Sequence, residues 1–222
     1  NHSGFPFMMI HVAHTFFKED GLGERYRLQA GDTLLAVDMQ NCFLPGGKLG
    51  IAGSNRIIAP INRMIRFFER KALPVAFSRD WHPPDHTSFQ EQGGPWPAHG
   101  VAGTADAAFS PELIIPAAAV IFSKATDKTS EEYSAFHAKN DAGLTLQTWL
   151  EQSNTKRVWV GGLATDYCVL NTVLDLRKAG YAVVVLTDAV YAVNLNSGDG
   201  DRALADMTAQ GTKMAQSDEV ED

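Results

Sequence analysis

Three side chains of this sequence, Asp38, Lys124 and Cys168, are of the types that carry out nucleophilic catalysis. A cysteine thiol has an ordinary pKa of about 8.5, so it needs a base or a positive field to attack at neutral pH. A carboxylate such as Asp38 can accept the thiol proton, and an ammonium such as Lys124 can hold that carboxylate ionised. Each residue alone also has a structural interpretation, as a loop or cap residue, a solvated lysine or a packing cysteine.

A second group of residues has the spacing of metal ligands. Asp80 and His82 are two positions apart, so an extended chain points both to the same side. A carboxylate combined with imidazoles suits Zn²⁺, Mn²⁺ or Fe²⁺. Two prolines then turn the chain so that His86 returns toward them, and His99 follows further along the same loop. The alternative interpretation is a proline-rich loop with incidental histidines.

The hydrophobic pattern predicts the elements that position these residues. Apolar runs predict six strands, at residues 33–39, 74–80, 119–125, 157–164, 181–190 and 213–217. Amphipathic spacing predicts four helices, at residues 54–71, 144–152, 167–180 and 201–210. This alternation predicts an α/β fold of three layers, α/β/α and Rossmann-like, with a six-stranded parallel sheet and helices on both faces.

Parallel strands bring their carboxyl ends to one edge of a sheet, and ligands bind there where the strand order reverses. Asp38, Asp80 and Lys124 end the first three predicted strands, and Cys168 follows the fourth at a predicted helix start. The positive end of that helix favours a thiolate. We therefore expect these four side chains to gather at one edge of the sheet.

Smaller signals refine the predicted elements. Ser54 and Asp166 are predicted helix caps, and Pro60 predicts that the first helix begins later than Ser54. His137 follows Phe136 in a predicted helix, and we interpret it as structural.

Composition and missing motifs argue against several classes of protein. The 222 residues include 19 Lys and Arg against 26 Asp and Glu, a net charge of −7 that argues against nucleic acid or a membrane surface as partner. No apolar run approaches the roughly 20 residues of a membrane span. Two cysteines are too few for a disulfide framework, which predicts a cytoplasmic location. Phosphate-loop, dinucleotide, zinc-protease and serine-hydrolase signatures are absent.

The length suits a single domain. We expect an N-terminal extension over residues 1–30, partly an expression remnant, followed by one domain over residues 31–222. The extension lacks the basic region of a signal peptide. Its His2, His11 and His14 are expected to take no part in the chemistry.

Five stretches of the sequence occur together and in a specific order: VDMQNCFLPGG, RDWHPPDHTSF, WPAHGVAGT, SKATDKTSEEYSAF and GGLATDYCV. Together they resemble the nicotinamidases of the isochorismatase-like cysteine hydrolase superfamily. The resemblance runs from about Thr33 to Ala192, and the Asp-x-His loop with its WPxH motif separates nicotinamidases from relatives that need no metal. It implies the isochorismatase-like hydrolase fold.

The resemblance implies an amidohydrolase that converts nicotinamide to nicotinate and ammonia through a cysteine thioester, with pyrazinamide as a further substrate. It implies Cys168 as nucleophile, Asp38 as base and Lys124 as the third member of the triad. The backbone N–H groups of Ala164 and Cys168 would form an oxyanion hole, following a cis peptide bond before Ala164.

The resemblance also implies one divalent ion, Zn²⁺ first, with Fe²⁺ or Mn²⁺ as alternatives. The implied ligands come from one loop: Asp80, His82, His99 and, in some members, His86. The implied pyridine pocket is lined by aromatic residues: Phe43, Trp96 and Tyr133. The expected partners are the small-molecule substrate and further copies of the chain in a homo-oligomer.

Three positions depart from the family pattern: Cys42 where Asp is usual, Gly100 where Cys is common, and Ala125 where Gly often follows the lysine. None of them removes a catalytic group. The nearest alternative function is another amidase on this fold, acting on N-carbamoyl or ureido compounds without the metal loop. A further alternative is a non-catalytic metal-binding or scaffold protein that inherited the fold.

Overall fold

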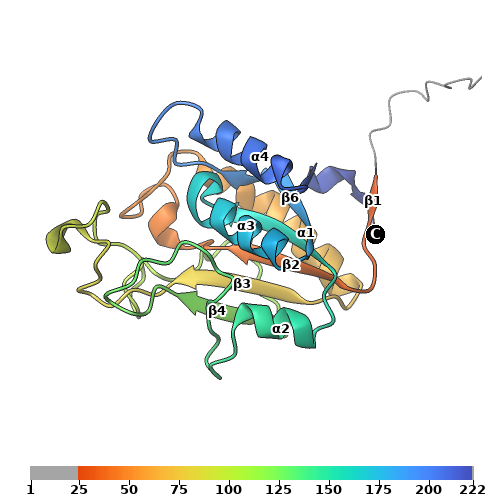
Figure 1. Cartoon of the computed structure of the whole chain (residues 1–222), viewed down its shortest axis with the longest axis horizontal. Coiled ribbons are helices and arrows are strands. Elements are labelled where there is room, and N and C mark those ends of the chain that lie inside the picture. Colours follow the sequence, from red (N-terminus) through yellow and green to blue (C-terminus); the bar gives the residue numbers. More distant parts are fainter. Residues whose placement is uncertain (1–24, 222) are drawn as a thin grey trace, which may run out of the picture.

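A six-stranded, fully parallel sheet forms the centre of the computed structural model, which describes residues 25–221 (Figure 1). The strand order is β4-β3-β2-β5-β6-β7. The strands of this sheet are β2 (Asp32–Val37), β3 (Val75–Asp80), β4 (Val120–Lys124), β5 (Arg157–Leu163), β6 (Ala182–Tyr191) and β7 (Lys213–Ala215). The helices are α1 (Ile58–Arg70), α2 (Leu146–Gln152), α3 (Leu170–Lys178) and α4 (Asp199–Ala209). The predicted three-layer α/β/α fold is confirmed.

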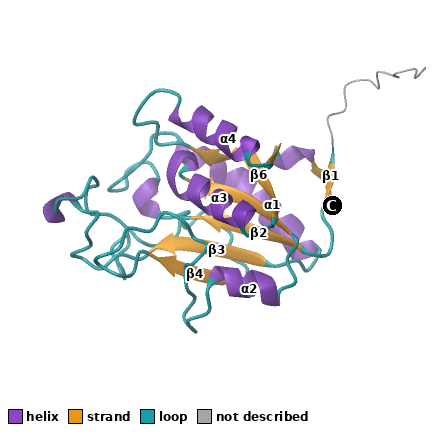
Figure 2. Ribbon diagram, viewed as in Figure 1, coloured by secondary structure: helices purple, strands orange, loops and turns teal. Residues whose placement is uncertain are grey.

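Both faces of the sheet are covered by helices, as Figure 2 shows. Successive side chains of β2 point to opposite faces, so Leu34 joins the core beneath α1 while Leu35 joins the core beneath α2, α3 and α4. This double burial explains why the strands read as continuous apolar runs rather than as alternating ones. No helix among residues 25–221 is both long and apolar enough to cross a membrane.

The first helix starts later than Ser54, as Pro60 predicts. A 3₁₀ turn occupies Ser54–Ile57, and α1 follows with Pro60 in its first turn, where a missing N–H costs nothing. The prediction that Ser54 caps the helix is wrong, because its hydroxyl donates to the carbonyl of Phe43 at 3.0 Å. Ser54 thus anchors the loop after β2.

Two other local predictions are also wrong. The segment after β5 forms a π-helical turn over Thr165–Val169 before α3 begins, and Asp166 does not cap it. Instead, the Asp166 carboxylate accepts the backbone N–H groups of Val193 and Asn194, which holds the loop after β6. His137 lies in an exposed turn rather than in a helix.

Two short strands that the sequence did not reveal join the ends of the described chain. β1 (Tyr26–Arg27), within the expected N-terminal extension, pairs in parallel with β8 (Val220–Glu221). Because each has only two residues, neither carries a readable hydrophobic period. His2, His11 and His14 lie outside the described residues.

A buried ion pair joins β2 to β5 at the amino ends of these strands. Asp32 is fully buried, and the Arg157 guanidinium binds both of its carboxylate oxygens, at 2.6 and 2.7 Å. The guanidinium also donates to the carbonyl of Arg27 at 2.9 Å, so it links β1 to the sheet. Such a two-pronged pair is geometrically specific.

Removing the arginine alone would leave a buried, uncompensated carboxylate. We expect Arg157→Leu to lower the free energy of unfolding by about 3 kcal/mol. Urea denaturation measures the change, with Arg66→Leu on the exposed side of α1 as the control. A change below about 0.5 kcal/mol, which is typical of surface positions, would contradict this role for the pair.

Candidate active site

The centre of the sheet is where the strand order reverses. From β2 the chain proceeds through β3 and β4 to one side, then returns through β5, β6 and β7 to the other. Asp38 directly follows β2, and the turn with Cys168 directly follows β5, the strand paired with β2. The reversal point therefore holds the two residues between which a thiol proton would move.

A glycine lets these two strand ends come close together. Gly162 has a φ of +126°, and a Cβ there would lie 2.0 Å from the carbonyl oxygen of Val37. No side chain fits at that distance, so only glycine permits this approach. The peptide bond that follows between Leu163 and Ala164 is cis, as the resemblance implies.

Asp38 is held rigidly and has no exposure to water. It adopts a φ of +49°, its backbone N–H donates to the Ser78 carbonyl at 3.1 Å, and the Ser78 hydroxyl donates to Oδ1 at 2.7 Å. Its Oδ2 makes no hydrogen bond within the described chain apart from the ion pair with Lys124. That oxygen keeps a lone pair able to accept a proton.

Lys124 is the residue on which the other charged groups converge. Asp80 and Lys124 are register partners on β3 and β4, so their side chains emerge side by side and form an ion pair. The Lys124 ammonium also lies 3.0 Å from Asp38 Oδ2 and 3.4 Å from Cys168 Sγ. It has only 1% of its surface exposed. One buried cation therefore faces both carboxylates and the thiol.

These contacts shift the pKa values of the two carboxyl groups in opposite directions. Burial would lower the pKa of Lys124, but Asp38 and Asp80 raise it well above its usual value, so the ammonium persists. Burial would likewise raise the pKa of Asp80, but the Lys124 ammonium holds it well below its usual range. Burial does raise the pKa of Asp38, because Lys124, shared with Asp80, offsets it only in part.

Of the two expected ways to activate Cys168, the helix start does not by itself hold the thiol as a thiolate. Burial and the nearby Asp38 raise the pKa of Cys168 well above its ordinary value, and Lys124 does not reverse this. Cys168 lies in the interior of the π-helical turn, where dipole stabilisation is weaker than at a free helix end. The neutral thiol therefore needs Asp38 as a proton acceptor when it attacks.

The candidate metal ligands lie beside this group. Asp80, His82 and His99 are all buried, and they place one ligand atom each within 4.8 Å of one another. The two histidine Nε2 atoms lie 3.5 and 3.7 Å from Asp80 Oδ2. Three ligand atoms of a hard and borderline type thus converge on one point.

The histidine tautomers show that this cluster fits a cation. Each Nδ1 faces a backbone carbonyl, that of Ala125 at 3.2 Å for His82 and that of Pro97 at 2.8 Å for His99. A carbonyl only accepts, so each Nδ1 carries the proton and each Nε2 presents a lone pair. His82 Nε2 is buried and has no hydrogen-bond partner among residues 25–221. Lone pairs directed at a carboxylate need a cation between them, as in a metal site.

His86 lies outside this cluster. Its Nε2 donates to the Ser130 carbonyl at 3.0 Å, and its Nδ1 pairs with the Ser88 hydroxyl at 2.7 Å. Its ring instead packs on that of His82, with the centroids 4.3 Å apart. The expectation that His86 joins the ligands is therefore not supported by its geometry, since both ring nitrogens are already engaged.

The structure shows the surroundings of the three residues that depart from the family pattern. Gly100 has a φ of +57°, and a Cβ there would lie only 3.2 Å from Asp80 Cβ. Ala125 adopts a φ of +50°, and its N–H donates to the Glu132 carboxylate at 2.9 Å. Cys42 is fully buried in the core, which raises the pKa of its thiol well above its usual value. None of the three leaves a gap in the site.

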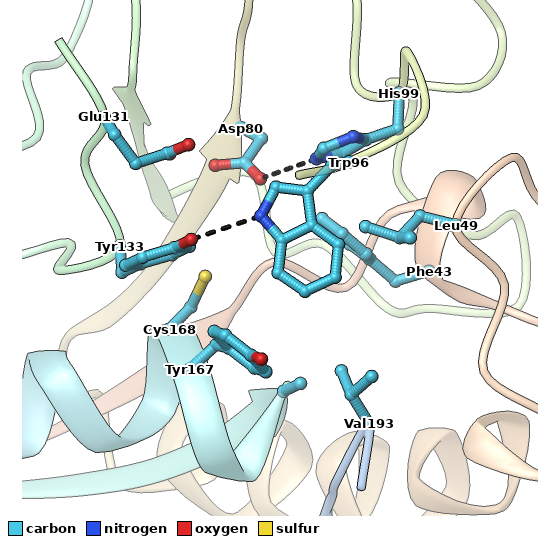
Figure 3. A pocket seen from close by; sticks show the side chains of 11 residues that line it. Phe43, Leu49, Asp80, Trp96, His99, Glu131, Tyr133, Tyr167, Cys168 and Val193 are labelled. Atoms are coloured by element: carbon cyan, nitrogen blue, oxygen red, sulfur yellow. Dashed lines mark hydrogen bonds and ion pairs between the residues drawn. The ribbon is translucent and has the colours of Figure 1, made fainter. Parts of the chain in front are cut away.

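A narrow pocket opens onto both groups (Figure 3). Phe43, Trp96 and Tyr133, the aromatic residues named above, all line it, and the indole N–H of Trp96 donates to the Tyr133 hydroxyl at 3.1 Å. The Cys168 sulfur points into the pocket, and Asp80 and His99 lie at its far side. Sequence reasoning missed four further lining residues: Leu49, Glu131, Tyr167 and Val193.

Two of these missed residues had a signal in the sequence, since Tyr167 precedes the candidate nucleophile and Val193 follows the end of a strand. Leu49 and Glu131 reach the pocket only through loop folding. The cavity measures about 40 Å³, whereas an apolar protein cavity that binds benzene measures about 150 Å³. A six-membered ring therefore enters only when the lining side chains move apart.

The two histidine environments lead to opposite predictions. His99→Asn removes a lone pair from the cluster and should lower divalent-metal affinity by at least tenfold. His86→Asn leaves the three converging ligand atoms in place and should keep one bound metal per chain. Metal analysis after dialysis measures both variants. Equal metal loss in the two would place His86 among the ligands.

Comparisons with known proteins agree with this geometry. The isochorismatase domain model matches residues 32–219. A nicotinamidase from Acinetobacter baylyi is 35% identical over 201 residues, covering 83% of this chain and 92% of the relative. A pyrazinamidase from Pyrococcus horikoshii, solved in complex with zinc, is 42% identical with a TM-score of 0.77, covering 84% of this chain and 99% of the other.

A third relative, PnC1 from L. infantum, was solved in complex with nicotinate. It is 32% identical with a TM-score of 0.75, covering 86% of this chain and 96% of the other. The matched family model spans the sheet and every residue of the two converging groups. The chain therefore belongs to the isochorismatase domain family.

Proposed function

We propose that this protein hydrolyses nicotinamide to nicotinate and ammonia, and that it also accepts pyrazinamide. The observation that carries the proposal is the shared pocket, in which a buried Asp38–Lys124–Cys168 group and an Asp–His–His cluster meet. Similar relatives include nicotinamidases and pyrazinamidases, which supports this substrate class.

The pocket is suited to a flat aromatic amide. Phe43, Trp96 and Tyr133 present aromatic surface, and offset ring stacking contributes about 0.5–1.5 kcal/mol per pair beyond the burial of area. Nicotinamide and pyrazinamide each carry a ring-nitrogen lone pair meta to the carboxamide. With the ring between these walls, the amide carbon faces Cys168 Sγ.

The metal cluster would hold Zn²⁺ at the other end of the pocket, bound by Asp80, His82 and His99. Zinc is favoured because a similar pyrazinamidase was solved with it, and because the donor set suits it. When bound, the ion supplies a Lewis acid for a ring-nitrogen lone pair and for water. The N-carbamoyl alternative leaves this buried cluster without a use.

The chain's own residues would carry the proton transfers. Asp38 accepts the thiol proton as Cys168 Sγ bonds to the amide carbon, and the backbone N–H groups of Ala164 and Cys168 stabilise the resulting oxyanion. Asp38 then passes the proton to the leaving nitrogen, so ammonia departs and a thioester remains. Next, Asp38 takes a proton from water, which attacks the thioester and releases nicotinate, and Asp38 returns this proton to the departing Cys168 sulfur.

The electrostatics of the site suit this proton shuttle. A carboxylate with a raised pKa is a stronger base than an ordinary aspartate, so Asp38 is better matched to a thiol. Lys124 stays charged throughout and lies 3.4 Å from the sulfur, where it would stabilise the thiolate that develops during attack.

Substitution of the nucleophile and the base tests the proposal. Cys168→Ala should reduce ammonia release from nicotinamide by at least a thousandfold, and Asp38→Asn by about a hundredfold or more. Cys42→Ala, which removes the other buried cysteine, is the control and should keep turnover within a few fold. Substantial hydrolysis by Cys168→Ala would exclude the thioester route.

The proton acceptor also predicts a pH profile. Because burial raises the pKa of Asp38 above 3.8, kcat/KM should fall on acidification with a midpoint above that value, as the carboxyl becomes protonated and cannot accept the thiol proton. Initial rates in overlapping buffers measure the profile, with circular dichroism checking that the fold persists. A profile that instead rises steadily toward pH 9 would indicate direct attack by a pre-formed thiolate.

A further inference from the structure

We propose that Asp106, which does not line the pocket, is a positioning residue that holds the metal ligands and the apolar pocket wall in register. The kinetic part of this inference rests on the proposed function, whereas the metal-binding part does not. Asp106 lies within the long loop between β3 and β4 and is half-buried. Its importance follows from what its two carboxylate oxygens bind.

The Asp106 carboxylate joins two separate loops through backbone groups. Its Oδ2 accepts the N–H of Gly100 at 3.0 Å, and its Oδ1 accepts the N–H of Lys48 at 3.2 Å. Its backbone carbonyl accepts a third N–H, that of Cys42, at 2.8 Å. One residue thus connects segment 42–49 to the loop that carries the metal ligands.

On the metal side, Gly100 contacts both histidines of the cluster. Its N–H belongs to the peptide unit that follows His99, so fixing this unit fixes the direction in which the His99 side chain leaves the backbone. Its carbonyl accepts the N–H of His82 at 3.0 Å. Gly100 has a φ of +57°, and as a glycine it has no side chain that could hold its backbone in place. The hydrogen bond from its N–H to the Asp106 carboxylate therefore fixes this peptide unit.

On the pocket side, Lys48 precedes Leu49, which lines the pocket. The N–H of Leu49 donates to the Cys42 carbonyl at 2.9 Å, which closes a small network of hydrogen bonds around Asp106. Phe43, another pocket residue, packs edge-on against the His99 ring with centroids 5.5 Å apart. A shift of segment 42–49 would therefore move both the wall and a metal ligand.

A carboxylate is required because both of its oxygens accept hydrogen bonds. An asparagine has the same shape but only one acceptor oxygen, and its NH₂ group would face a backbone N–H. Asp106→Asn therefore breaks one of the two connections without changing volume. Asp106→Ala breaks both.

The experiment compares Asp106→Asn and Asp106→Ala with a matched control, Asp188→Asn. The Asp188 carboxylate also ties two segments together, accepting the N–H and the hydroxyl of Ser217 at 2.9 and 2.6 Å, but it lies outside the pocket lining. Zn²⁺ affinity of the metal-free proteins is measured by competition with a chelating dye, and Co²⁺-substituted protein gives a visible spectrum. Steady-state kinetics with nicotinamide follow on the zinc-loaded proteins.

We expect Asp106→Asn to weaken Zn²⁺ binding about tenfold, to change the Co²⁺ spectrum and to raise KM more than it lowers kcat. Asp106→Ala should have larger effects on each of these quantities. Asp188→Asn should leave Zn²⁺ affinity, KM and kcat within twofold of the wild type and the Co²⁺ spectrum unchanged. Wild-type Zn²⁺ affinity and an unchanged Co²⁺ spectrum in a folded Asp106→Asn protein would overturn the proposal, as would equal losses in Asp188→Asn. If the wild-type protein binds Zn²⁺ but does not hydrolyse nicotinamide, the proposed function fails while the metal readouts still decide the role of Asp106.

Discussion

The buried ammonium of Lys124 is the interaction on which the rest of the site depends. It is enclosed by Asp38, Asp80 and Cys168, and it has almost no contact with water. A buried cation is stable only when paired, and here two carboxylates share it. Sharing makes the two carboxylates different: Asp80 remains strongly ionised beside the histidines, whereas the pKa of Asp38 rises toward that of a useful base. One lysine thus pairs with both the candidate metal ligand Asp80 and the candidate base Asp38.

The sheet explains how three residues far apart in the chain reach one lysine. Asp80 and Lys124 are neighbours because β3 and β4 pair in parallel register, and Asp38 and the Cys168 turn are neighbours because β2 and β5 pair at the reversal point. The close approach at Gly162 draws Asp38 and the Cys168 turn together, and the pairing of β2 with β3 places them beside Asp80 and Lys124. Loops then complete the site, and Asp106 connects two of them.

Much of the fold and the site could be predicted from the sequence, because strand ends are strong signals. Apolar runs buried on both faces end abruptly at a polar residue, and this locates Asp38, Asp80 and Lys124 without any structure. The errors involve side chains with more than one available partner. Ser54 and Asp166 have typical capping chemistry, yet both bind distant backbone groups instead. His86 stays a prediction: it has the spacing of a ligand, and its nitrogens contact Ser88 and Ser130, which spacing alone does not reveal.

The sequence by itself determined the order of the strands and helices, the residue types at the strand ends and hence the candidate nucleophile, base and metal ligands. These depend on local periodicity and on the rule that parallel strands end at one edge. Only the tertiary structure decided which histidine nitrogens keep a free lone pair, which carboxylate has the raised pKa and which loops Asp106 joins. The physical reason is that hydrogen-bond partners and burial are set by long-range packing, and a pKa follows from both.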